Sequence, residues 1–93
     1  MNNFVQIVAH IIKEQELIIG PLAWLEAKKV AGIRILDEKL GKIDLVGDPK
    51  QVVDGLVAQY DRLFGRASHE VSREAAMPFL KTLAPADIPA SLR

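Results

Sequence analysis

The side chains that could carry out chemistry are few, and the two histidines come first among them. His10 and Glu14 lie one turn apart on a predicted helix, a spacing that could hold a metal ion or form an acid–base pair. His69 and Glu70 begin another predicted helix, but the residues that follow lack the second histidine of the zinc-protease motif. We favour the simpler interpretation, in which one histidine pairs with a carboxylate and the other lies at a solvated helix start.

Other catalytic and cofactor-binding motifs are missing from the sequence. The glycines are isolated single residues, so they form neither a phosphate-binding loop nor a nucleophile elbow. Gly47-Asp48-Pro49 precedes a predicted helix whose start could attract an anion, but the carboxylate of Asp48 would repel phosphate. We therefore predict that the protein is not an enzyme and that it uses no cofactor and no metal.

A repeat with an offset of about 45 residues organises the chain. An amphipathic run that ends at Gly20 is matched by a second run that ends at Gly65. The apolar residues of the two runs match in order: Ile7, Val8, Ile11, Ile12, Ile18 and Ile19 fall on Val52, Val53, Leu56, Val57, Leu63 and Phe64. Small residues match beyond the glycines: Ala23 with Ser68, Ala27 with Ser72, and Ala31 with Ala76. The pattern predicts two helix–glycine–helix units, at about 3–31 and 48–77, in a pseudo-twofold four-helix arrangement.

The first unit is predicted to contain helices over 3–19 and 21–31, because apolar residues recur there at three-and-four spacing. Asn2 or Asn3 can cap the first of these helices. Gly20-Pro21 between them indicates either a corner or a kink in one long helix. We favour the corner, because the second unit has a glycine at the same place.

The second unit is predicted to contain helices over 49–64 and 67–77. Asp48 provides the N-cap of the first and Pro49 its first helical residue. Its apolar face is expected to run through Leu63 to a stop at Gly65. Pro78 is expected to break or kink the second helix, and the tail over 84–93 is expected to be poorly ordered.

The segment between the two units has two interpretations. Apolar and polar residues alternate around Ile33 and again around Ile43, which favours a β-hairpin at about 33–46. The alternative extends the preceding helix to a stop at Gly41. We prefer the hairpin, which would have to pack on helices or pair across a dimer. The expected fold class is mainly α, with four helices and this short hairpin.

Nucleic-acid binding is the strongest rival function for the second unit. The helices over 49–64 and 67–77 resemble the two helices of helix-turn-helix regulators, with Gly65 in the turn and Val71 buried. The residues that would then face the groove are Arg66, His69 and Arg73. Asp61, where that motif usually has a small buried residue, argues against it. Formal net charge is zero, so attraction to phosphate backbones is not favoured.

Trp24 is the one tryptophan, and a core position is its default role. Neighbouring Leu22 and Leu25 cannot point in the same direction as Trp24 on a helix, so at least one of the three side chains should face outward. Tryptophan often anchors protein interfaces. The candidate partner surface therefore consists of Leu22, Trp24, Leu25, Lys28 and Lys29.

One short motif resembles a known class of domain. Ile18-Ile19-Gly20-Pro21-Leu22-Ala23, followed by Lys28-Lys29-Val30-Ala31, is similar to small helical modules at the C-termini of bacterial signalling proteins such as serine/threonine kinases. The resemblance covers about fifteen residues and implies a non-catalytic interaction or regulatory module. The chain departs from the pattern at Arg66, where the second unit would need a proline.

Composition indicates a single small domain over 1–93 that associates with another chain. Hydrophobic residues make up 49% of the sequence, which is generous for this length, and there is no cysteine to supply disulfides. We expect a cytoplasmic protein with no signal peptide and no membrane-spanning helix. The predicted function is a non-enzymatic protein-interaction or regulatory module that forms a homodimer. The alternatives are the helix-turn-helix protein and a small-ligand-binding helical bundle, for which a pocket between the units holding His10 or Gln15 would be diagnostic.

Overall fold

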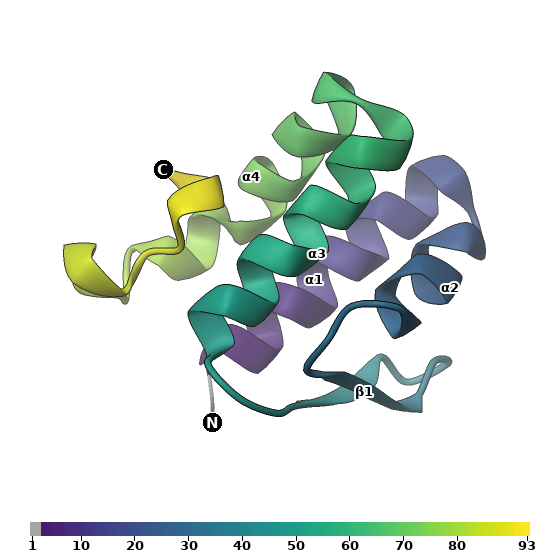
Figure 1. Ribbon diagram of the computed structural model, residues 1–93, viewed down its shortest axis with the longest axis horizontal. Coiled ribbons are helices and arrows are strands. Elements are labelled where there is room, and N and C mark those ends of the chain that lie inside the picture. Colours follow the sequence, from purple (N-terminus) through teal and green to yellow (C-terminus); the bar gives the residue numbers. More distant parts are fainter. Residues whose placement is uncertain (1–2) are drawn as a thin grey trace.

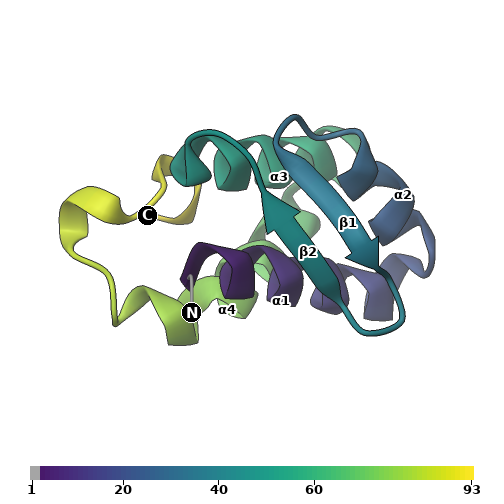
Figure 2. The same ribbon diagram turned by 90° about the horizontal axis from the view of Figure 1, so that it is seen from below.

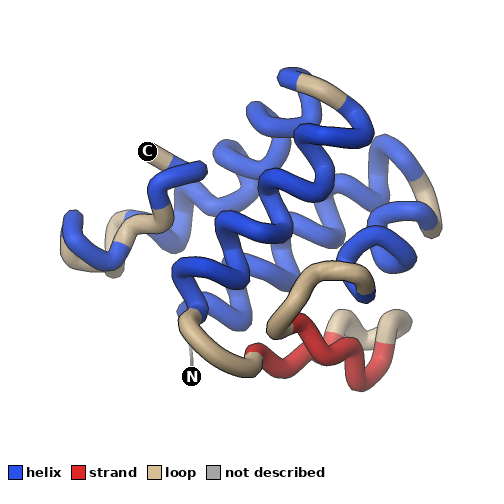
Figure 3. Tube along the Cα trace, viewed as in Figure 1, coloured by secondary structure: helices blue, strands red, loops and turns tan. Residues whose placement is uncertain are grey.

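The computed structural model describes residues 3–93 and contains four α-helices and one β-hairpin, which confirms the predicted fold class (Figure 1). The elements in chain order are α1 (Asn3–Ile19), α2 (Leu22–Lys28), β1 (Ile33–Asp37), β2 (Lys42–Leu45), α3 (Pro49–Phe64) and α4 (Arg66–Leu80). Two short 3-10 turns follow, η1 (Pro85–Asp87) and η2 (Ala90–Leu92) (Figure 3). A cap from Asn2 lies outside the described residues.

A corner separates α1 from α2, as the glycine predicts. Gly20 has a φ of +69°, a left-handed conformation that glycine adopts without steric cost. α2 is shorter than expected and ends at Lys28, so that Ala31 belongs to the turn before β1. The helix stops there because Val30 turns inward to the core and Gly32, with a φ of +93°, redirects the chain.

The segment between the units forms the predicted hairpin, and the helical alternative is wrong. β1 and β2 are antiparallel, with Ile33 opposite Leu45 and Ile35 opposite Ile43. Ile33 and Ile43 are buried, because the hairpin packs on α1 and α2 (Figure 2). A two-stranded ribbon is only marginally stable by itself, so this burial against helices holds it in place.

α3 begins and ends where the sequence predicts. The Asp48 side chain accepts a hydrogen bond of 3.0 Å from the Lys50 backbone N–H, and Gly65 closes the helix with a φ of +81°. Leu63 departs from the prediction, because its side chain is 46% exposed. The buried stripe of α3 ends at Tyr60, and Leu63 lies off that stripe at the corner.

The end of the chain is more regular than predicted. α4 runs through Pro78 to Leu80. The proline removes the N–H that would bond to the Glu74 carbonyl, but both residues are exposed, so solvent can reach that carbonyl. The tail packs against α3 and α4 through η2. Its Leu92 is 3% exposed, and the backbone N–H and hydroxyl of Ser91 both donate to Asp54 Oδ1.

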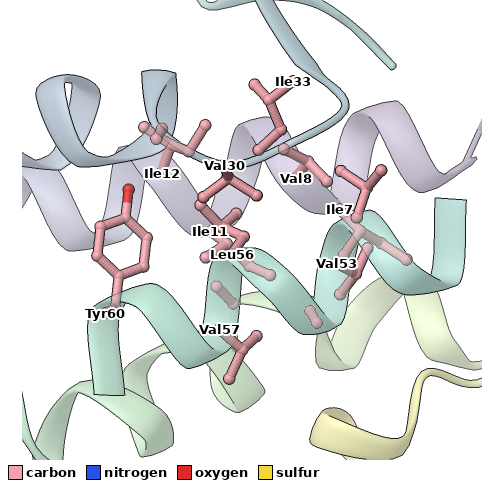
Figure 4. Packing of buried hydrophobic residues seen from close by; sticks show 14 of the residues in the cluster. Ile7, Val8, Ile11, Ile12, Val30, Ile33, Val53, Leu56, Val57 and Tyr60 are labelled. Carbon is pink, nitrogen blue, oxygen red and sulfur yellow. The ribbon is translucent and has the colours of Figure 1, made fainter. Parts of the chain in front are cut away.

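One hydrophobic core joins the two units. α1 and α3 face each other with their apolar stripes, and α2, α4, the hairpin and η2 pack around them (Figure 4). The matched pairs of the repeat are buried together: Ile7 with Val52, Val8 with Val53, Ile11 with Leu56, and Ile12 with Val57. Of the small-residue pairs, Ala23 with Ser68 and Ala27 with Ser72 are buried, whereas Ala31 is exposed and Ala76 is buried.

Polar contacts between the two units are reciprocal. Gln15 Nε2 in the first unit donates to the Ser68 carbonyl at 2.8 Å. Tyr60, the counterpart of Gln15, donates its hydroxyl to the carbonyl of Ala23, the counterpart of Ser68, at 2.6 Å. A twofold relation between the units would produce such contacts, because each contact from the first unit to the second would then be repeated from the second unit to the first.

Candidate functional site

The histidine on α1 forms a long, solvent-exposed contact with Glu14. His10 Nε2 lies 3.6 Å from Glu14 Oε1, and both side chains are about two-fifths exposed. The imidazole also meets the Phe79 ring edge-on, with 5.7 Å between ring centroids. Within residues 3–93, no three His, Asp or Glu side chains are grouped so that they could hold a metal ion.

The histidine on α4 has a partner that the sequence analysis missed. His69 Nδ1 lies 2.6 Å from Asp61 Oδ2, across the corner between α3 and α4. A histidine held by a carboxylate is the orienting half of many catalytic dyads. The nearby buried Ser72, however, is occupied as the acceptor of a bond from Gln15 Nε2.

The His–Asp pair has a counterpart at the other corner. The counterparts of Asp61 and His69 are Glu16 and Trp24, and Trp24 Nε1 donates to Glu16 Oε2 at 2.9 Å across the first corner. An indole cannot exchange a proton in catalysis, yet it occupies the same place. Each corner is therefore closed by a ring nitrogen on the second helix and a carboxylate on the first. The repeat offset contained this signal, because it aligns both pairs of residues.

Buried polar side chains connect the two units inside the core. Gln15 is 1% exposed, and Tyr60 is fully buried. Burial raises the pKa of the Tyr60 hydroxyl above its ordinary value of 10.0, and the carboxylates of Glu26 and Glu16 add to the increase. The hydroxyl is therefore held as a neutral donor, which suits its structural bond to Ala23.

An apolar groove lies between the end of α1 and the start of α4. Its deeper part is a hollow of about 280 Å³ between the two units, with Gln15 and Ser68 among its lining residues. Ile18 and Val71 line both this hollow and an adjoining one of about 460 Å³, so the two form a continuous groove. We call it the α1–α4 groove. Its apolar lining residues are Leu17, Ile18, Ile19, Phe64, Ala67, Val71 and Ala75.

The rim of the α1–α4 groove combines apolar and acidic side chains. Leu17 and Ile18 are 80% and 64% exposed, although both are large aliphatic residues. Glu14 and Glu74 line the outer part of the groove together with His10. Glu74 has no ion-pair partner in the described part of the chain. The groove therefore offers an apolar floor and a negatively charged edge.

The predicted partner surface is retained only in part. Trp24 is 2% exposed and belongs to the core, so it cannot form part of an exposed surface. Leu22 and Leu25 are 46% and 51% exposed on α2, as the helical geometry requires once Trp24 points inward. Lys28 pairs with Glu38 at 2.8 Å and Lys29 with Glu26 at 3.1 Å, and both lysines are more than half exposed. The hydrogen bonds from Gln59 and Lys29 lower the pKa of the Glu26 carboxyl.

The residues of the predicted nucleic-acid face do not form a free basic surface. His69 is tied to Asp61, and Arg73 Nη1 lies 3.7 Å from Glu70 Oε2, so only Arg66 lacks an ion pair among these three. Only Gly65 separates α3 from α4, whereas the helix-turn-helix motif has a turn of three or four residues. α4 is also packed along α1 and α3 rather than projecting from the fold (Figure 1).

Comparisons with protein-family models, with curated proteins and with solved structures gave no significant match for this chain. In residues 3–93, no helix combines the length and the apolar character needed to cross a membrane.

Proposed function

We propose that this protein is a non-enzymatic protein-interaction module that associates with a second copy of itself. The observation that supports this most strongly is the exposure of Leu17 and Ile18, at 80% and 64%, beside an apolar groove. Burying such side chains in a partner would remove apolar surface from water, which is the main driving force of association.

The matching contacts at the two corners support an interaction role rather than catalysis. They account for the His69–Asp61 pair as a structural contact, because Trp24 and Glu16 form the equivalent contact in the other unit. The buried polar groups Gln15 and Tyr60 are likewise used to join the units. The α1–α4 groove and its charged rim remain at the surface, where a partner can reach them.

Two matched substitutions test the proposal. Leu17→Glu places a charge beside the groove and is expected to give a monomer, whereas Leu36→Glu makes the same change at an exposed hairpin leucine and should leave association unchanged. The molar mass measured by light scattering after size exclusion distinguishes these outcomes. A Leu17→Glu protein that associates as strongly as the wild type would contradict the proposal.

A small apolar ligand is a second candidate, favoured by the hollow that Gln15 lines between the two units. Its volume of about 280 Å³ lies near the lower end of the range for ligand pockets. A heat-stability increase with 1-hexanol that disappears in Ala67→Leu, where the added side chain fills the hollow, would favour this candidate.

A further inference from the structure

We infer that the outer face of α2 in one copy docks into the α1–α4 groove of a second copy, with Lys28 and Lys29 against Glu14 and Glu74. This inference rests on the proposed self-association and adds to it the two surfaces that meet. We call the first of them the α2 face, which consists of Leu22, Leu25, Lys28 and Lys29.

The α2 face has the pattern that the groove requires. Leu22 and Leu25 are one turn apart and exposed, and Lys28 and Lys29 follow one turn later. Two apolar side chains followed by two cations therefore lie along one short helix. The Lys28–Glu38 pair is exposed on both sides and contributes little to stability, so Lys28 can change partners at small cost. Lys29 is also exposed, and its partner Glu26, which is 12% exposed, keeps a hydrogen bond of 2.8 Å from Gln59 when Lys29 changes partners.

The groove offers the complementary pattern in the same order. Ile18, Phe64 and Ala67 form its apolar end, and Glu14 and Glu74 lie towards its other end. Glu74 has no ion-pair partner within residues 3–93. An arriving lysine would therefore meet an uncompensated carboxylate, and complementary charges of this kind select the partner and fix its register.

The residue types at the hollow suit a leucine from a partner. At the repeat offset Ala67 corresponds to Leu22, so the second unit has a methyl group where the first has a leucine side chain. The hollow that Ala67 lines, of about 280 Å³, has room for a branched aliphatic side chain, and the α2 face presents two. The groove and the α2 face are different surfaces of one chain, so two copies related by a twofold axis would make each contact twice.

Charge reversal tests the inference. Lys28→Glu with Lys29→Glu makes the α2 face acidic, and Glu14→Lys with Glu74→Lys makes the groove basic. Each double variant alone is expected to raise the self-association Kd at least about tenfold, because like charges then meet at both contacts. An equimolar mixture of the two should form a heterodimer with a Kd within about threefold of the wild-type value, because both contacts are again attractive. Sedimentation equilibrium at 150 mM and at 500 mM NaCl gives these constants.

A matched control removes the effect of net charge. Lys39→Glu with Lys42→Glu makes the same charge change on the hairpin, so it should leave self-association unchanged. This control variant should bind the Glu14→Lys, Glu74→Lys variant more weakly than the Lys28→Glu, Lys29→Glu variant does. Equal binding in the two mixtures, or unchanged self-association in both reversal variants, would overturn the inference while leaving self-association itself in place. A wild-type protein that is monomeric throughout would instead contradict the proposed function.

Discussion

Single residues decide how the two units are joined. Gln15 and Tyr60 occupy equivalent positions, and each donates to a backbone carbonyl of the other unit. The sequence indicates that Gln15 interrupts an apolar stripe, but the partner of a buried amide depends on which helix crosses it. The His69–Asp61 pair was missed for a similar reason, because the adjacent Glu70 is nearer in sequence than Asp61, whereas the corner brings Asp61 nearer in space.

Tyr60 yields a prediction on alkaline pH. The folded-state pKa is raised, so the unfolded chain ionises first, near pH 10, and the stability of the fold should fall as pH rises above that value. Tyr60 is the one tyrosine in the sequence, so tyrosinate absorbance reports this group alone. We expect its midpoint in the folded protein to lie well above that of the urea-unfolded protein. Equal midpoints in the two states would contradict the burial of this hydroxyl.

Removing the Tyr60 hydroxyl also tests the link between the units. Tyr60→Phe should lower the free energy of unfolding by about 1 kcal/mol, because the buried bond to the Ala23 carbonyl is lost while ring packing is kept. Urea unfolding at pH 7 measures this value. The variant should also lose the part of the alkaline destabilisation that belongs to Tyr60.

At the scale of elements, local signals predicted most of the fold. We could predict the helices of both units, the corner at Gly20 and the hairpin. Their signals, which are glycine, proline and the spacing of apolar residues in helices and strands, lie within a few residues of each element. The packing of the tail could not be predicted from the sequence, because it depends on contacts with helices that are distant in the chain. Leu92 is buried only because α3 and α4 lie beneath it, and the sequence of the tail contains no periodicity that would show this.

Gly→Ala substitutions at three positions should lower the stability of the fold by different amounts. Gly20 and Gly65 have positive φ values but open space around an added Cβ, so Gly→Ala at either strains only the backbone. That strain should lower the free energy of unfolding by about 1 kcal/mol at Gly20. The loss should be about 2 kcal/mol at Gly65, because its φ of +81° and ψ of −165° lie in a region that essentially only glycine occupies. Gly32→Ala should cost more, about 3 kcal/mol, because its Cβ would lie 2.5 Å from Val52 Cγ2 and 2.6 Å from the Val46 carbonyl oxygen. Urea unfolding of the three variants ranks them. Similar losses at all three positions would contradict the close approach at Gly32.

For the whole molecule, the sequence repeat matches the packing of the core, and the differences between the units carry the functional proposal. Both units use their matched apolar residues for the common core, and both corners are closed by equivalent polar pairs. The units differ beside the corners, where Leu22 of the first unit corresponds to Ala67 of the second. The sequence analysis identified the α2 leucines and lysines, but not the groove, because the groove is lined by helices that are distant in the chain.

Self-association is the claim on which the functional account depends, and the mass of the wild-type protein in solution tests it most directly. Sedimentation equilibrium over a wide concentration range should show the mass rising from that of one 10.3 kDa chain towards twice that value. A mass that stays at 10.3 kDa up to millimolar concentration would contradict the account.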